Sequence, residues 1–287
     1  MISELTQSMI NMYYRCGHQF YLRYIKGTKR PPGIHLIKGT GTHAGVEYGY
    51  NQKIATGELP PEDEVADAAH DAFVDVVVNG SSYGGERGPR GVWLAPDEVC
   101  RKKEILGEAL DESIKLAQFY RKVVAPTDKE IALVEERLFA DIGVGIPISF
   151  KPDVVVDGKL RDVKTAGKRW PKGKEDGEIQ PTLYRMGLRE HGFGDLNAEF
   201  VVLSNVKSKP KDDSGILFDG DLCVIGDPRP TERTYEHEEA LKLRIHNMME
   251  SINKGVFLPA HPEMYTCSPS WCGYYDICPY MKGRKVI

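Results

Sequence analysis

The sequence predicts a fold that combines helices with a β-sheet, of the α/β (α+β) class, and three observations lead to this prediction. Residues 1–130 are mainly helical in pattern, residues 131–225 change to short runs of β-branched side chains, and residues 226–287 hold a long helix followed by a cysteine-rich segment. At 287 residues the chain is long enough to bury a sizeable core. We therefore expect a single domain with these three parts.

Helices make up most of the first part. Leu5–Tyr24 carries apolar side chains at spacings of three and four, with Thr6 or Ser8 as the candidate N-cap. Gly39–Gly57 is interpreted as a glycine-rich turn that runs into a second helix, with His43 in the first helical turn. Two further helices are expected at Pro61–Val78 and Pro96–Val124, with a mobile loop, Asn79–Gly91, between them.

The second part is expected to form the sheet. Two β-branched runs flank Asp157-Gly158, and Asp-Gly between such runs is the strongest short-range signal of a β-hairpin. The expected strands are Ile131–Phe139, Ile148–Val156, Lys159–Thr165, Ala198–Leu203 and Ile216–Ile225, and the expected helices are Glu178–Glu190 and Glu232–Asn253.

A two-residue turn at Asp157-Gly158 fixes the register of the hairpin. Val156 then faces Lys159 and Val154 faces Arg161, which places Asp153 opposite Asp162. Lys164 follows Asp162 on the same face of the sheet. Opposed carboxylates destabilise a sheet unless something lies between them, and a divalent cation would do so. The alternative is a solvated face with ordinary surface charges.

Other polar residues could join this site, although each of them alone is a weak signal. His43 has small neighbours that leave room for another element or a ligand, but a single histidine is more often structural. Glu135 is either a solvated residue of its strand or a further site acid. Gln180 and Tyr184 lie one turn apart on one helix face, where an amide and a phenol suit phosphate or base contacts. The alternative for this pair is a polar residue beside a half-buried tyrosine.

The cysteines indicate a second site. Cys267, Cys272 and Cys278 lie within twelve residues that also contain proline, glycine and aromatic residues, as in a metal-binding loop. Three thiolates need a fourth ligand, and Cys16 is the obvious donor. A disulfide within the triplet would leave one of its three cysteines over, and Cys16 alone could be a small buried side chain.

Composition is ordinary for a soluble globular protein, with 41% hydrophobic and 28% charged residues. The net charge of -4 does not indicate nucleic-acid binding, but basic residues gather in four segments: Arg23–Arg30, Lys164–Lys174, Lys207–Lys211 and Lys282–Lys285. No run of apolar residues suits a membrane span or a secretory signal. We expect a cytoplasmic protein that has no membrane partner.

The order of these motifs resembles the PD-(D/E)XK nuclease superfamily, and specifically its RecB-like branch that carries an iron–sulfur cluster. That branch includes nuclease domains of bacterial helicase–nucleases and the CRISPR adaptation exonucleases. The resemblance extends from Leu5 to Pro279. It rests on a cysteine in the first helix, Gly-x-x-x-His, Pro-Asp, Asp-x-Lys, Gln-x-x-x-Tyr and the C-terminal cysteine triplet.

This resemblance implies a restriction-endonuclease-like core, with a central mixed sheet flanked by helices. It implies that Mg²⁺ or Mn²⁺ binds to His43, Asp153, Asp162 and Val163. It also implies that Lys164 positions the attacking water and that Asp153, Asp162, Gln180 and Tyr184 take part in catalysis. The four cysteines Cys16, Cys267, Cys272 and Cys278 match the ligands of a [4Fe–4S] cluster. Zinc is the alternative, because four residues separate Cys267 from Cys272 where the branch often has two.

The resemblance further implies a metal-dependent DNA exonuclease that acts on single strands or DNA ends in recombination, repair or CRISPR adaptation. The chain lacks a P-loop motif, so it would act alone or with a separate helicase, CRISPR or recombination partner. The alternative is a non-catalytic DNA-binding or scaffold subunit that keeps the fold and the cluster.

Overall fold

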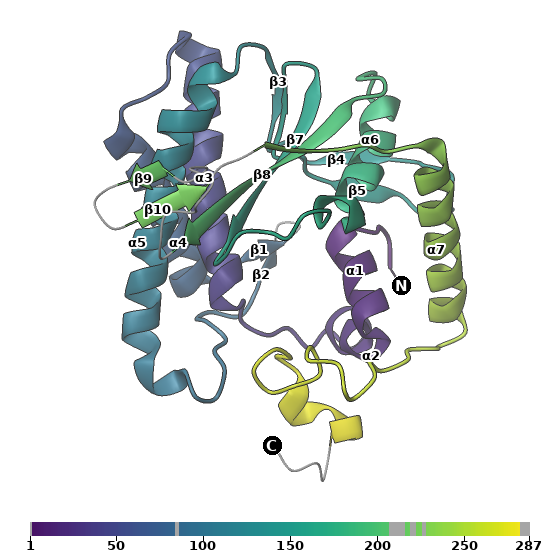
Figure 1. Ribbon diagram of the computed structural model, residues 1–287. Helices are drawn as coiled ribbons and strands as arrows, with labels where there is room; N and C mark the ends of the chain where they lie inside the picture. Colours follow the sequence, from purple (N-terminus) through teal and green to yellow (C-terminus); the bar gives the residue numbers. More distant parts are fainter. Residues whose placement is uncertain (1, 84–85, 207–215, 219–221, 226–227, 282–287) are drawn as a thin grey trace.

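The computed structural model describes residues 2–83, 86–206, 216–218, 222–225 and 228–281. A twisted sheet runs through the middle of the molecule, and helices cover both of its faces (Figure 1). The predicted central mixed sheet flanked by helices is therefore confirmed. Two of the expected basic segments, Lys207–Lys211 and Lys282–Lys285, lie outside the described residues.

The main sheet has its strands in the order β3-β6-β7-β8-β10-β9, with β11 also paired to β8. β7 and β8 are parallel and the other neighbours are antiparallel, so the sheet is mixed. The strands are β3 (Ile131–Val134), β6 (Val154–Val156), β7 (Lys159–Ala166), β8 (Asn197–Val206), β9 (Ile216–Phe218), β10 (Leu222–Ile225) and β11 (Pro228–Thr231).

The predicted hairpin register is correct from Val156 to Val154, but Asp153, which was predicted to face Asp162 across the strand pair, lies just before the start of β6. Val156 pairs with Lys159 and Val154 with Arg161. Asp157 and Gly158 have φ angles of 49° and 71°. Positive φ at both turn positions is what a two-residue hairpin turn of the favoured type requires.

Helices cover the two faces of the sheet in separate groups. On one face lie α3 (Ile34–Thr56), α4 (Glu62–Asn79) and α5 (Lys102–Phe119), and on the other lie α1 (Gln7–Arg15), α6 (Gln180–Glu190) and α7 (Tyr235–Asn253) (Figure 1). Alternate strand residues supply the two cores. Val154, Val156, Val163, Val201 and Leu203 pack toward α3 and α5, whereas Leu133, Val155, Leu160 and Ala198 pack toward α1, α6 and α7.

Two strands predicted as continuous are broken at the same level. The prediction Ile131–Phe139 divides at Glu135 into β3 and β4 (Leu138–Ala140). The prediction Ile148–Val156 divides into β5 (Ile148–Phe150) and β6, and β4 pairs with β5 in a separate sheet. The two paired segments thus change direction together, and their pairing continues in a second sheet with a different orientation. The predicted strand Ile216–Ile225 is likewise two strands, with residues 219–221 outside the description.

The prediction of one helix over Leu5–Tyr24 is also wrong, because the segment forms three elements. Thr6 caps α1 as expected, but the backbone is extended at Cys16, with φ of -164° and ψ of 103°. The short helix α2 (Gly17–Phe20) follows, and a π-helical turn, Tyr21–Ile25, completes the segment. Cys16 ends α1 and is the N-cap of α2. Its thiol therefore does not lie on the buried face of a continuous helix, but accepts the main-chain N–H of Gln19.

Two other predictions of local structure need correction. The glycine-rich segment that starts at Gly39 is helical, because α3 already begins at Ile34. The expected loop Asn79–Gly91 contains a short antiparallel pair, β1 (Ser82–Tyr83) and β2 (Glu86–Arg87).

The segment that follows α1 lies beside the C-terminal segment that follows α7 (Figure 1). The N–H of His18 donates to the carbonyl of Leu258, and the hydroxyl of Tyr274 donates to the carbonyl of Thr28. Arg30 holds both oxygens of the Asp276 carboxylate at 2.7 Å. Among the described residues, none of the helices has the length and apolar character that crossing a membrane requires.

Candidate metal-dependent active site

The candidate site lies at the break between the two sheets. The N–H of Glu135 donates to the carbonyl of Asp153 at 3.1 Å, which is the main-chain bond that spans the break. Glu135 has a φ of 46°, a left-handed conformation that a residue other than glycine adopts at some cost. Such strain gathers at functional sites, where the surrounding structure enforces it. Here it turns the Glu135 side chain out of the strand pattern and toward Asp153.

The third member of the site, His43, comes from α3. A Cβ atom at Gly41 would lie 2.4 Å from Ser113 Oγ, and one at Gly45 would lie 2.6 Å from Ala117 Cβ. Glycine at these positions therefore allows α4 and α5 to pack directly against α3. The small neighbours of His43 thus make room for other helices, and this close packing fixes the helix that presents the imidazole.

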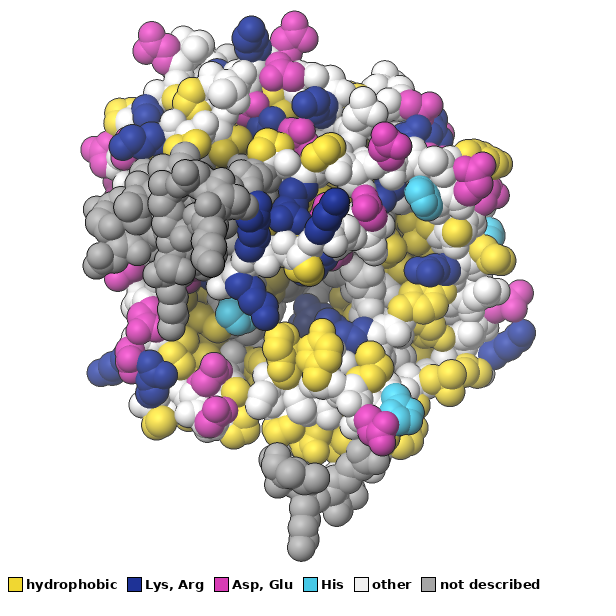
Figure 2. Space-filling view, in the orientation of Figure 1, with side chains coloured by type: hydrophobic (Ala, Val, Ile, Leu, Met, Phe, Trp, Pro, Cys, Tyr) yellow, Lys and Arg dark blue, Asp and Glu magenta, His cyan; other side chains and the backbone are white. Residues whose placement is uncertain are grey.

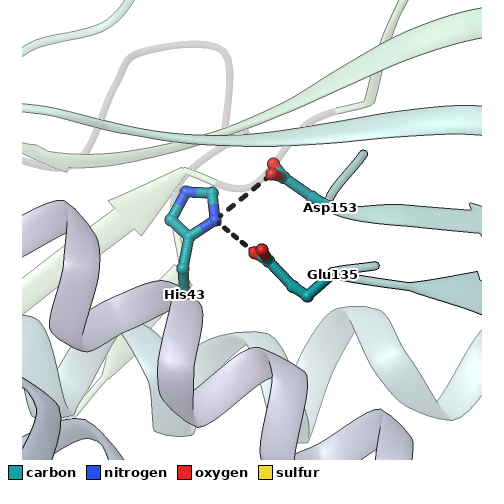
Figure 3. A group of neighbouring side chains, drawn as sticks. All are labelled: His43, Glu135 and Asp153. Carbon is teal, nitrogen blue, oxygen red and sulfur yellow. Dashed lines mark hydrogen bonds and ion pairs between the residues drawn. The ribbon is translucent and has the colours of Figure 1, made fainter. Parts of the chain in front are cut away.

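His43, Glu135 and Asp153 converge, with the imidazole pointing at both carboxylates (Figure 3). His43 Nδ1 lies 3.1 Å from Glu135 Oε1 and 3.4 Å from Asp153 Oδ1. One ligand atom from each of the three lies within 4.8 Å of the others, in the part of the chain that the structure describes. Two carboxylate oxygens and an imidazole nitrogen at this spacing can hold a divalent cation.

The charges of the three residues stabilise one another. Burial opposes protonation of His43, but the carboxylates of Asp153 and Glu135 outweigh it and hold the pKa of the imidazole well above its usual value. Burial also opposes ionisation of Asp153, yet the charge of His43 lowers the pKa of that carboxyl. The protonated imidazole therefore occupies the place of a cation, and a metal ion that binds here must displace its proton.

A second group lies next to this cluster on β7 and α6. Gln180 donates from its amide to Asp162 Oδ1 and accepts from Lys164 Nζ at 2.8 Å. Lys164 Nζ also lies 2.6 Å from Asp162 Oδ2, in an ion pair that lacks hydrogen-bond alignment. The Asp162 residue is 3% exposed, and its Oδ2 atom accepts no aligned hydrogen bond from any described residue. This buried carboxylate oxygen already faces one cation, the Lys164 ammonium, and is suited to binding a metal ion as well.

The pKa values in this second group are strongly perturbed. Burial raises the pKa of Asp162 to about 7, against the opposing charge of Lys164 and with the help of Asp153. Burial would lower the pKa of Lys164, but Asp162 and Asp153 outweigh it and raise that pKa. Lys164 therefore keeps its proton, which suits it to orient a water or stabilise negative charge.

The remaining predicted residues, Tyr184 and Val163, lie at the edge of the site. The Tyr184 ring packs on Phe150 with centroids 5.5 Å apart, and burial raises the pKa of its hydroxyl. The N–H of Val163 donates to Asp153 Oδ2 at 2.6 Å and so orients that carboxylate. The described contacts thus bring His43 and Asp153 together, and join Asp162, Lys164 and Gln180 in an adjoining group.

Sequence reasoning left Glu135 open and missed two further residues. Lys151 Nζ lies 2.7 Å from Glu135 Oε2 and 3.9 Å from Glu47 Oε2. Glu47 follows His43 by one helical turn, so the i, i+4 spacing was a signal for it. Lys151 precedes Asp153 by two residues and looked like part of a continuous strand, which hid its position at the break.

The four predicted cysteine ligands also converge, at the other end of the molecule. Cys16, Cys267, Cys272 and Cys278 all line one cavity of about 30 Å³. Cys16 Sγ accepts main-chain N–H groups from Gln19 at 3.4 Å and from Ala260 at 3.3 Å. His18 and Thr266 line the same cavity, and His18 Nε2 and Thr266 Oγ1 are buried without a hydrogen-bond partner in the described structure.

Comparison with known proteins gives one family match. The model of the family described as "PD-(D/E)XK nuclease superfamily" matches residues 4–279. A solved structure from Eubacterium rectale, described as a "Putative exonuclease", is similar with 13% sequence identity and a TM-score of 0.47, over 99% of this chain and 89% of that chain. No curated protein matches the sequence.

Proposed function

Because the chain belongs to the PD-(D/E)XK nuclease superfamily, we propose that it is a metal-dependent deoxyribonuclease, an exonuclease that acts on single strands or DNA ends. The observation that carries this proposal is the convergence of His43, Glu135 and Asp153 beside the pair formed by Asp162 and Lys164. We propose Mg²⁺ or Mn²⁺ as the cation, because carboxylates favour both ions and an imidazole shifts the preference toward Mn²⁺.

The donor set fits such an ion. His43, Glu135 and Asp153 offer three ligand atoms, and Oδ2 of Asp162, which is ion-paired with Lys164, offers another oxygen nearby. We retain Asp162 and Val163 as proposed ligands beside Glu135. A bound divalent ion supplies a lowered pKa for water, neutralisation of charge on the phosphoryl oxygens and stabilisation of the leaving oxygen.

In this proposal the side chains near the metal site have separate roles in phosphodiester hydrolysis. Water adds to phosphorus, the bond from phosphorus to the ester oxygen breaks, and the proton lost by the water is balanced by one that the departing oxygen takes up. Lys164 keeps its proton, so it orients the water and stabilises negative charge. Gln180 holds Lys164 and Asp162 in fixed relation, and Asp153 is oriented by the N–H of Val163. Tyr184 lies at the cavity beside the site, where it can contact the substrate.

We also propose that the four cysteines bind a [4Fe–4S] cluster, with zinc as the alternative. Cys16 Sγ accepts two N–H groups, as a thiolate ligand commonly does, and His18 Nε2 and Thr266 Oγ1 near the cavity have no hydrogen-bond partner among the described residues. Thiolates that bind one zinc ion would lie about 3.8 Å apart. No three cysteine sulfurs among the described residues form a group within 4.8 Å, so their spacing does not match that of a single zinc ion. The proposed role is structural, since the ligands come from both ends of the chain.

End-labelled single- and double-stranded DNA, incubated with the anaerobically purified protein and Mg²⁺, Mn²⁺ or EDTA, tests the proposed activity. We expect hydrolysis that begins at an end and requires the metal. Binding of DNA without hydrolysis would instead favour a non-catalytic scaffold. The proposed setting is recombination, repair or CRISPR adaptation, with a separate helicase or CRISPR partner protein.

A further inference from the structure

Lys151 lies between the metal-binding cluster and a large cavity. Its ammonium is 2.7 Å from Glu135 Oε2 and its side chain is 48% exposed. Lys151, Phe150 and Tyr184 all line a cavity of about 610 Å³. A group that enters the site from this cavity would therefore meet the Lys151 ammonium beside the metal-binding carboxylates.

The cavity suits a polyanion. Its described lining contains one carboxylate, Glu4, which is paired with Arg137 at 2.5 Å. Lysine and arginine side chains gather around the hollow in the middle of the face that Figure 2 shows. The basic residues of the lining are Arg23, Lys29, Arg30, Arg137 and Lys151.

Lys151 is well placed to change partners. While no cation is bound, its ammonium balances the charge of Glu135, and Glu47 is the next carboxylate at 3.9 Å. When Glu135 binds a divalent cation, the positive charge of the ion offsets that of the carboxylate, and the attraction between Glu135 and Lys151 weakens. A lysine has a flexible stem of four carbons, so the released ammonium can turn toward the cavity without any movement of the backbone.

We propose that Lys151 is a phosphate-binding residue, which leaves Glu135 when the metal site fills and binds a backbone phosphate of the DNA strand in the cavity. This inference rests on the proposed function, because it takes the metal site and the DNA substrate from it. It adds a coupling between the two ligands: a filled metal site makes Lys151 available to DNA, and bound DNA keeps Lys151 from competing for Glu135. Such coupling is reciprocal by thermodynamic necessity.

The test measures binding of a short fluorescent single strand at a series of KCl concentrations, in the presence of Mg²⁺ or of EDTA. All variants carry Lys164→Met, so that the strand stays intact. We expect Lys151→Met to weaken binding in Mg²⁺ by about three- to tenfold and to reduce the slope of log Kd against log salt by about 0.7, the value for one phosphate contact on a single strand. In EDTA the same substitution should change neither quantity, since Lys151 then stays with Glu135.

Two matched variants complete the experiment. Lys151→Arg keeps the charge and should keep most of the slope. Lys254→Met removes an exposed lysine that forms an ion pair with Glu250 on α7, and should leave binding unchanged. Three results would overturn the inference. They are an unchanged salt slope for Lys151→Met in Mg²⁺, an equal loss of DNA affinity for Lys151→Met in EDTA, and no DNA binding by the parent protein. If the wild type binds DNA with this pattern but hydrolyses none, the proposed activity fails and the role of Lys151 stands.

Discussion

The main-chain N–H of Glu135 donates a 3.1 Å hydrogen bond to the carbonyl oxygen of Asp153, at the level where both strands of the pair break. This bond holds two acidic residues side by side that are eighteen positions apart in the sequence. Both carboxylates then face His43 on a helix from the other half of the fold. A break in regular structure, rather than a strand, is therefore what assembles the metal-binding cluster.

Glu135→Gln should weaken Mn²⁺ binding at least about tenfold, because an amide brings one oxygen and no charge to the cluster. The measurement is calorimetric titration of Mn²⁺ into the purified variant. Glu136→Gln is the matched control, since Glu136 is the exposed neighbour and should bind Mn²⁺ as the wild type does. Equal affinities for all three proteins would exclude Glu135 from the metal site.

Stability of the metal-free protein should fall as the pH rises from about 6 to about 8. His43 has a raised pKa, so its protonation stabilises the folded state below the usual histidine pKa, and this stability is lost as the pH rises through the folded value. Asp162 has its pKa raised to about 7, so its protonated form also stabilises the folded state. This contribution is lost as the pH rises through that value. Asp153 has a lowered pKa, so its contribution is lost only as the pH falls through that value, outside this window.

Thermal unfolding in EDTA checks this expectation, with each kcal/mol of lost stability lowering Tm by about 2–4 °C. Mg²⁺ or Mn²⁺ should restore more stability at the upper pH than at the lower one, because fewer protons must then be displaced. A metal-free Tm that is constant or rises across the window would contradict the assigned charges of His43 and Asp162.

Gly17→Ala should destabilise the protein by about 1–3 kcal/mol and disturb the cysteine cavity. A Cβ atom there would lie 2.8 Å from the N atom and 2.9 Å from the O atom of Leu258, and main-chain atoms cannot move aside cheaply. The segment that would be pushed away includes Ala260, whose N–H donates to Cys16 Sγ.

Denaturant unfolding and the iron and zinc content of the purified variant are the two measurements for Gly17→Ala. Gly107→Ala is the control, because Gly107 is exposed on α5 with open space at its Cβ position. That substitution should stabilise the protein by about 0.4–1 kcal/mol. Wild-type stability and metal content in Gly17→Ala would mean that the contact between α2 and Leu258 does not support the cavity.

Local sequence signals predicted the parts of the site that local geometry determines. Asp157-Gly158 indicated the hairpin, and the two-residue period of a strand then placed Asp162 and Lys164 on one face of β7. Spacing on a helix did the same for Gln180 and Tyr184. The structure places these residues on the expected faces, because each prediction of placement rests on residues that are close in sequence.

Features that depend on distant packing could not be predicted in this way. The strand pattern continues through Glu135 and Lys151, and only the pairing of the two broken strands reveals the bend between them. Gly41 resembles a turn residue, but it lies inside α3 because α4 and α5 require a surface without side chains. Cys16 interrupts its helix because the C-terminal segment binds there, 244 residues further along the chain.

The most direct test of metal-dependent hydrolysis is the rate at which the purified protein releases nucleotides from end-labelled single-stranded DNA in Mn²⁺. We predict that EDTA abolishes the release and that Lys164→Met lowers the rate by at least about a hundredfold. Lys254→Met, the charge-matched control at the residue after α7, should keep the rate of the wild type. Equal rates for the wild type and Lys164→Met would contradict the account.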